Sequence, residues 1–227
     1  MTGTGTGALS LVHLVQEPRL VVAGTRPPLL LLLHGVGSNE HDLFSLAPAL
    51  DPRFLIVSAR APYQVENGGN GWFHIRFTAE GPVINPDEAE ESRRTLRRFL
   101  DELTERYGID PHRRFLMGFS QGAIMSLCVM LTAPEALAGV VAMSGRLLPE
   151  IRPKAVPAER LRAFPVLVQH GLYDQLLPIG YGRDIRDYLA ATPAALTYRE
   201  YPIGHQVTEQ SLEEARAWLA DHLDTAR

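Results

Sequence analysis

The sequence predicts a single-domain α/β protein with a doubly wound, mostly parallel sheet. Short apolar runs alternate with longer amphipathic segments along the chain, and most of these runs are continuous rather than alternating. Continuous runs of about five apolar residues are typical of strands that helices cover on both faces. The length of 227 residues suits one domain of this class.

Eight segments are predicted as strands. Residues 29–33, five consecutive leucines, are the clearest, whereas residues 196–201 are more amphipathic and are expected nearer an edge of the sheet. The predicted strands in chain order are residues 9–15, 20–23, 29–33, 54–58, 115–119, 140–143, 166–169 and 196–201.

Four long helices are predicted, over residues 87–107, 121–131, 179–191 and 211–223. In the first, apolar residues recur at three- and four-residue steps, with Pro86 suited to the first turn and Gly108 to the end. The second is apolar nearly all round, so we expect it to be buried and to stop before Pro134.

The composition excludes several classes of protein. With 45% hydrophobic residues and a net charge of −4, the chain is neither disordered nor a typical basic nucleic-acid binder. The single cysteine, Cys128, excludes an intramolecular disulfide and a four-cysteine zinc site. No signal peptide or membrane-spanning segment is predicted, so we expect a cytoplasmic protein without stable membrane insertion. Residues 1–7 are expected to be a disordered tail, and residues 8–227 one domain without a large cap.

Residues 118–122, Gly-Phe-Ser-Gln-Gly, match the G-x-S-x-G pattern of a serine nucleophile. A predicted strand precedes Ser120 and a predicted buried helix follows it, which is the context that the pattern requires. Bulky side chains at 118 and 122 would collide with neighbouring backbone, and glycine avoids this. The alternative is an ordinary turn in which the serine caps the helix.

A base and an orienting acid for Ser120 are found in the expected chain order. Asp174 and His205 each follow a predicted strand, at the edge where open α/β sheets form their sites. His34 and His170 end strands directly, where histidines often bond to the backbone. None of the eight histidines has the spacing of a common metal motif, so no metal or cofactor is predicted.

Two backbone N–H groups are predicted to stabilise an oxyanion beside Ser120. One belongs to Gln121, the residue after the serine, and the other to Val36 in the loop after residues 29–33. The glycine-rich segment 68–73 ends in Trp72 and Phe73. These aromatic residues are expected either to line an acyl pocket or to pack in the core.

The motifs together resemble the phospholipase/carboxylesterase family of α/β-hydrolases, which includes acyl-protein thioesterases and small carboxylesterases. The resemblance extends from about residue 29 to residue 219 and rests on segments 33–37, 72–73, 118–122, 170–178 and 204–205. It implies an α/β-hydrolase fold, a Ser-Asp-His triad and metal-independent hydrolysis of esters or thioesters. Trp72 and Leu177 are the candidate substrate-binding residues. His74, Ala123 and Gln175 depart from the family pattern, and His74 leaves the polarity of the pocket open.

The sequence therefore predicts a serine carboxylesterase that acts on small esters through Ser120, Asp174 and His205. One alternative is an acyl-thioesterase or lysophospholipase that takes longer acyl chains. Another is a binding protein that keeps the fold without catalysis. The expected partner is a small ester or thioester, not nucleic acid, and a homodimer stays open.

Overall fold

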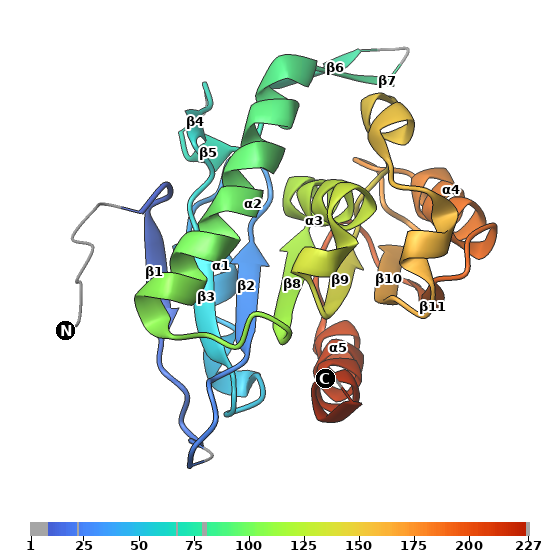
Figure 1. The fold of residues 1–227 in the computed structure, drawn as a ribbon. Helices are drawn as coiled ribbons and strands as arrows, with labels where there is room; N and C mark the ends of the chain where they lie inside the picture. Colours follow the sequence, from blue (N-terminus) through green and yellow to red (C-terminus); the bar gives the residue numbers. More distant parts are fainter. Residues whose placement is uncertain (1–8, 22, 67, 79–80, 226–227) are drawn as a thin grey trace.

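The computed structural model describes residues 9–21, 23–66, 68–78 and 81–225, drawn as a ribbon in Figure 1. The predicted N-terminal tail, residues 1–7, lies outside this part of the chain. The main sheet has seven strands in the order β1-β3-β2-β8-β9-β10-β11. Their bounds are β1 His13–Gln16, β2 Leu29–Leu33, β3 Leu55–Ala59, β8 Arg114–Phe119, β9 Gly139–Met143, β10 Pro165–Gly171 and β11 Ala195–Tyr201.

The sheet confirms the predicted doubly wound, mostly parallel arrangement. Neighbouring strands from β3 to β11 pair in parallel, and only the edge strand β1 runs antiparallel to its neighbour β3. From β2 the chain passes to β3 on one side and later returns to β8 on the other. Loops that follow β2 and β8 thus diverge at the carboxyl edge of the sheet, where open α/β folds bind their ligands.

Helices cover the two faces of the sheet, and the leucines of β2 alternate between them. Leu29, Leu31 and Leu33 belong to a core shared with helices α2, α3 and α4. Leu30 and Leu32 belong to a second core shared with α1 and α5. Figure 1 shows α2, α3 and α4 in front of the sheet. The helix bounds are α1 His41–Phe44, α2 Pro86–Tyr107, α3 Gln121–Thr132, α4 Ile179–Ala190 and α5 Glu209–Thr225.

The strand expected over residues 20–23 is wrong for the residues that the structure describes there. Arg19 and Leu20 both donate their N–H groups to the carbonyl of Pro52, which holds the chain in a surface loop. Leu20 and Val21 are 52% and 74% exposed, so these apolar side chains do not pack against the sheet as those of a strand would. Gly24, with a φ of 77°, then turns the chain toward β2.

Two small hairpins and several short 3₁₀ helices were not predicted. The hairpins pair β4 Tyr63–Gln64 with β5 Asn70–Gly71, and β6 Ile75–Thr78 with β7 Gly81–Ile84. In Figure 1 the β6–β7 hairpin projects at the top, beyond the carboxyl edge of the sheet. The 3₁₀ helices are η1 Ala47–Ala49, η2 Pro134–Ala136, η3 Pro149–Lys154 and η4 Ala158–Leu161.

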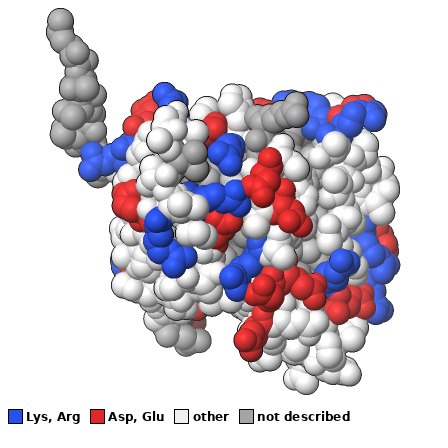
Figure 2. Space-filling view, turned by 90° about the horizontal axis from the view of Figure 1, so that it is seen from below, with Lys and Arg blue, Asp and Glu red and all other residues white. Residues whose placement is uncertain are grey.

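The surface mixes charges of both signs. Figure 2, a view from below, shows Lys and Arg side chains beside Asp and Glu side chains on that face. Among the described helices, none is both long enough and apolar enough to cross a membrane. Cys128 is buried in α3, and burial raises the pKa of its thiol to about 12, so this thiol is part of the packing.

Candidate active site

Ser120 stands at a sharp turn between β8 and α3. Its φ is 55°, a left-handed conformation that residues with a side chain seldom adopt. Its N–H donates to the carbonyl of Met143 at 2.9 Å, which continues the β8–β9 ladder. Its carbonyl accepts from the N–H of Ile124 at 3.1 Å, which is the first helical hydrogen bond. One residue therefore ends the strand and begins the helix, as the motif predicts.

The glycines on both sides of Ser120 are required by close backbone contacts. A Cβ atom on Gly122 would lie 1.9 Å from the carbonyl oxygen of Leu33. A Cβ atom on Gly118 would lie 2.3 Å from the carbonyl oxygen of Gly122. The opposing atoms are backbone, so they cannot rotate away. This confirms the predicted steric reason for glycine at both positions and brings the β2 loop against the start of α3.

Gly122→Ala is expected to lower the free energy of unfolding by about 3 kcal/mol or more, because the new methyl group displaces β2 or α3. The midpoint of thermal unfolding, followed by circular dichroism, should fall by roughly 6–12 °C. Gly180→Ala is the matched control. Gly180 is likewise the second residue of its helix, but apart from its chain neighbours and the backbone of its own helix no described atom lies within 4 Å of its Cβ position. Equal melting temperatures for the two variants would contradict the steric argument.

Ser120, His205 and Asp174 form one chain of hydrogen bonds. The Nε2 atom of His205 lies 2.9 Å from the Ser120 hydroxyl, and its Nδ1 atom lies 2.7 Å from Oδ2 of Asp174. The other carboxylate oxygen of Asp174 accepts from the N–H groups of Leu176 and Leu177, at 3.0 and 2.8 Å. The aspartate thus has a fixed orientation, and a neutral imidazole with its proton on Nδ1 can accept the serine proton at Nε2.

The loops that carry Asp174 and His205 are joined by backbone hydrogen bonds. Leu172 N–H donates to the carbonyl of Tyr201, and Tyr173 N–H to that of Ile203, at 2.7 and 3.0 Å. A Cβ atom on Gly171 would lie 2.4 Å from the carbonyl oxygen of Gly204, so this glycine also permits a close approach. The parallel pairing of β10 with β11 therefore continues into the loops. It sets the acid beside the base although 31 residues separate them.

His34 and His170 both bond to the backbone, as the sequence suggested. Nδ1 of His34 lies 2.7 Å from the Gly35 carbonyl, and its Nε2 accepts from Ala61 N–H at 3.0 Å. Nε2 of His170 lies 2.7 Å from the carbonyl of Leu177. Burial lowers the pKa of both imidazoles, which favours their neutral forms. His34 therefore braces the β2 loop, and His170 braces the loop that holds Asp174.

The N–H groups of Val36 and Gln121 are free to bind an oxyanion. Within the described residues neither group donates a hydrogen bond, and both residues line a cavity with Ser120. The Gln121 N–H is free because it belongs to the first turn of α3. The Val36 loop is fixed from its far side, where Gly37 N–H donates to the Asn70 carbonyl at 2.9 Å.

The side chain of Gln121 is a contact that the sequence did not reveal. Its Oε1 accepts from Trp72 N–H at 2.6 Å, and its Nε2 donates to the Phe73 carbonyl at 2.7 Å. The Trp72 indole N–H in turn donates to the carbonyl of His34 at 3.0 Å. Trp72 is fully buried and is not a wall residue of the cavity at Ser120. Of its two expected roles, the structure places it in the core, where it ties the segment 70–73 to the β2 loop.

Leu177, the other candidate substrate-binding residue, lines the cavity beside Ser120. This cavity has a volume of about 180 Å³ and a mostly apolar wall. Phe119 contributes a ring whose centroid lies 4.9 Å from that of His205. Several wall residues were not predicted, because they come from five different segments of the chain. The full set is Gly35, Val36, Ser38, Asp42, Ile75, Phe119, Ser120, Gln121, Ile124, Leu176, Leu177 and His205.

A larger groove of about 470 Å³ adjoins this cavity and shares Val36 and Ile75 with it. His74 lies in this groove and is half-exposed. Its Nδ1 lies 2.9 Å from a carboxylate oxygen of Glu88, and its Nε2 lies 3.1 Å from the Gln64 carbonyl. The hydrogen bond to Glu88 raises the pKa of His74. Because Glu88 lies on α2, this contact links the base of the β6–β7 hairpin to that helix. No cluster of potential metal ligands occurs among the residues described.

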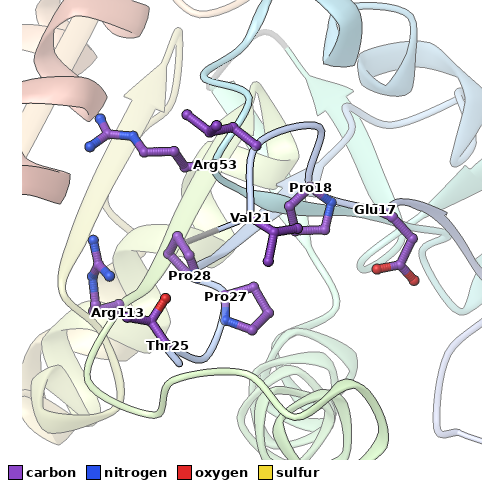
Figure 3. A pocket seen from close by; sticks show the side chains of 9 residues that line it. Glu17, Pro18, Val21, Thr25, Pro27, Pro28, Arg53 and Arg113 are labelled. Carbon is purple, nitrogen blue, oxygen red and sulfur yellow. The ribbon is translucent and has the colours of Figure 1, made fainter. Parts of the chain in front are cut away.

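A third cavity lies at the opposite end of the sheet and is shown in Figure 3. Its volume is about 360 Å³. Its walls include residues just before parallel strands, such as Pro28, Arg53 and Arg113, whereas Ser120 and its partners follow strands. The lining contains no serine, cysteine or histidine, so we do not regard this cavity as a candidate active site. Its lining residues are Glu17, Pro18, Leu20, Val21, Thr25, Pro27, Pro28, Arg53 and Arg113.

Comparison with known proteins gives concordant matches over nearly the whole chain. The chain is 29% identical to MhqD of Bacillus subtilis over 198 residues, 87% of this chain and 95% of that protein. It is 28% identical to acyl-protein thioesterase 1 of Cryptococcus neoformans, over 94% of this chain and 98% of that protein. The crystal structure of the Bacillus cereus carboxylesterase superposes with a TM-score of 0.79 at 27% identity, over 93% of this chain and 94% of that one.

The family model described as Phospholipase/Carboxylesterase matches residues 18–223. This range includes the turn at Ser120 and the loops of Val36, Asp174 and His205. The fold, the similar hydrolases and the family model agree with the resemblance found in the motifs. The chain is therefore a hydrolase and belongs to the phospholipase/carboxylesterase family, with a single-domain α/β-hydrolase fold.

Proposed function

We propose that this hydrolase is a serine carboxylesterase that cleaves small carboxylic esters through an acyl-enzyme. The observation that carries the proposal is the hydrogen-bonded chain from Ser120 through His205 to Asp174 at the wall of a cavity. Two free N–H groups, those of Val36 and Gln121, line the same cavity. A nucleophile, a base and oxyanion donors are thus all available to one bound carbonyl group.

The reaction follows from these positions. The Ser120 hydroxyl attacks the ester carbonyl carbon as its proton passes to Nε2 of His205, and Asp174 stabilises the resulting imidazolium. The carbonyl oxygen becomes an oxyanion that accepts hydrogen bonds from Val36 and Gln121. When the oxyanion reforms the carbonyl and the carbon–oxygen bond to the alkoxide breaks, the His205 imidazolium gives its proton to that oxygen, and the alcohol leaves. A water molecule, deprotonated by His205, then attacks the acyl-enzyme and releases the carboxylic acid and Ser120.

The size of the cavity favours small acyl groups, whereas the adjoining groove favours a second candidate function. A volume of about 180 Å³ suits a short acyl chain, but the groove of about 470 Å³ gives a longer chain room to continue past Val36 and Ile75. Similarity to an acyl-protein thioesterase supports the same alternative, hydrolysis of longer acyl thioesters. The cytoplasmic location stays a prediction from the sequence. Formation of a homodimer stays open.

Active-site labelling combined with a substrate series tests the proposal. A fluorophosphonate probe should label the folded protein, and mass spectrometry of the peptides should place the label on Ser120. Among 4-nitrophenyl esters, we expect kcat/KM to be highest for acyl chains of about two to six carbons and to fall for longer chains. Protein unfolded in urea is the control and should not react.

Matched esters and thioesters with the same acyl chain separate the two enzymatic functions. A higher kcat/KM for thioesters with long chains than for any short ester would favour the thioesterase. A folded protein that neither reacts with the probe nor hydrolyses any substrate would overturn the proposal. The catalytically silent binding protein would then be the better description.

A further inference from the structure

Arg146 leaves the sheet at the same edge as Ser120. It lies three residues beyond β9, the strand that pairs with β8 on the side away from β2. Ser144 N–H donates to the Gln169 carbonyl at 2.8 Å, so the chain follows the sheet as far as Ser144. Ser144 has a φ of 51°, and the chain turns there toward α3. The residues that follow β8 and β9 therefore lie side by side.

The segment of Arg146 packs against a helix that contributes to the wall of the Ser120 cavity. A Cβ atom on Gly145 would lie 3.4 Å from the backbone nitrogen of Ile124, which is a wall residue. The guanidinium carbon of Arg146 lies 5.7 Å from the centre of the Tyr181 ring. Tyr181 belongs to the first turn of α4, which begins two residues after the wall residue Leu177. The Arg146 side chain thus runs from a segment that packs against α3 near Ile124 to the start of α4, the helix that follows Leu177.

The guanidinium of Arg146 is a buried cation without a carboxylate. The residue is 7% exposed, its Nε has no hydrogen-bond partner, and no ion pair to it is formed within the described residues. Burial lowers the pKa of its guanidinium, and the Tyr181 hydroxyl and the distant Glu150 oppose only part of this shift. Arg114 provides the contrast, because this arginine is 5% exposed and has Asp101 at 3.0 Å.

A buried arginine stays protonated, and its charge must be balanced to offset the loss of water. The Tyr181 ring provides a cation–π contact, which compensates only part of this cost. Arg146 therefore has donors available for an anion that the described residues do not provide. The planar fork of a guanidinium matches the two oxygens of a carboxylate.

We propose that Arg146 is a specificity-determining residue that binds a carboxylate of the ester substrate, so that the preferred substrates are half-esters with one free carboxylate. Binding of such a carboxylate requires the side chain to turn from the Tyr181 ring toward the Ser120 cavity. The carboxylate belongs either to the acyl part or to the alcohol part, and the experiment distinguishes the two. The inference rests on the proposed esterase function.

Pairs of substrates that differ in charge test the inference. The acyl pair is 4-nitrophenyl hydrogen adipate and 4-nitrophenyl hexanoate. The alcohol pair is 4-butyryloxybenzoate and its uncharged amide, 4-butyryloxybenzamide. In one of the two pairs, we expect the wild-type protein to have a kcat/KM about 10- to 100-fold higher for the charged member, as a charge-assisted bidentate contact predicts. No preference in either pair would overturn the inference.

Three variants show whether Arg146 causes the preference. Arg146→Met should remove it by lowering kcat/KM for the charged ester about 10- to 100-fold, with less than about a threefold change for the neutral ester. Arg146→Lys should retain part of it. Arg152→Met is the matched control, because Arg152 also lies over a tyrosine ring on α4, at 5.3 Å, but already pairs with Asp184. Equal losses for charged and neutral esters in Arg146→Met would contradict a role in charge recognition.

Binding measurements separate this inference from the esterase proposal. In the wild-type protein, the monoamide of adipate and 4-hydroxybenzoate should bind more tightly than the uncharged hexanamide and 4-hydroxybenzamide, as measured by calorimetry and by inhibition of neutral-ester hydrolysis. This result needs no variant, so it holds even if Arg146→Met does not fold. If neither anion binds more tightly although neutral esters are hydrolysed, only the role of Arg146 is refuted. If no ester is hydrolysed and Ser120 is not labelled, the esterase proposal fails instead.

Discussion

Ser120→Ala is expected to lower kcat for 4-nitrophenyl butyrate on the order of 10⁶-fold, because no other described hydroxyl or thiol lies at the cavity in contact with His205. The fold should be unchanged. Alanine has the same backbone requirements at a φ of 55° as serine, and the Ser120 hydroxyl bonds only to His205 among the residues described. Steady-state rates, circular dichroism and loss of labelling by the fluorophosphonate probe measure these outcomes.

Ser126→Ala is the matched control for this substitution. Ser126 lies on α3, the helix that Ser120 precedes, and is fully buried. Among the described residues its hydroxyl donates only to the Gly122 carbonyl, at 2.9 Å. Its removal should leave kcat within about twofold of the wild-type value, since its hydroxyl does not line the cavity. If Ser120→Ala kept a substantial part of the wild-type rate, Ser120 would not be the nucleophile.

Asp174→Asn is expected to lower kcat by about 10⁴-fold with little change of structure. The reason lies in the two backbone N–H groups of Leu176 and Leu177, which donate to Oδ1 of Asp174. An asparagine must keep its carbonyl oxygen toward these donors, so its NH₂ group faces Nδ1 of His205. The imidazole must then accept at Nδ1 and carry its proton on Nε2. In that tautomer it cannot take the proton of Ser120.

The melting temperature and a surface control distinguish this tautomer effect from a general loss of stability. Asp187→Asn is the control, because the Asp187 side chain is 67% exposed and, within the part of the chain that the structure describes, pairs only with its neighbour Arg186. It should leave the rate and the melting temperature near the wild-type values. Asp174→Asn should also keep a melting temperature near the wild-type value, although its kcat falls. An Asp174→Asn protein with an unchanged kcat at neutral pH would contradict the assignment of Asp174.

The elements with strong local patterns could be predicted from the sequence. The five leucines of β2 predicted a strand buried on both faces, and their alternation between the two cores explains why every position is apolar. The glycines at 118 and 122 predicted a close backbone approach before any neighbour was known. Residues 20–23 show the limit of such patterns, because an exposed apolar segment and a buried one look alike until the neighbouring Pro52 carbonyl is placed.

By itself, the sequence determined the fold class, the residue types of the candidate site and their order along the chain. Only the tertiary structure decided that Trp72 is buried and that the side chain of Gln121 holds the segment 70–73. It likewise decided that the cavity beside Ser120 and the adjoining groove share Val36 and Ile75. It also decided that Arg146 is buried without a carboxylate. The physical reason is that local periodicity reports which faces of an element are apolar, whereas these features depend on contacts between segments far apart in the chain. Such contacts are set when the strands take their order in the sheet.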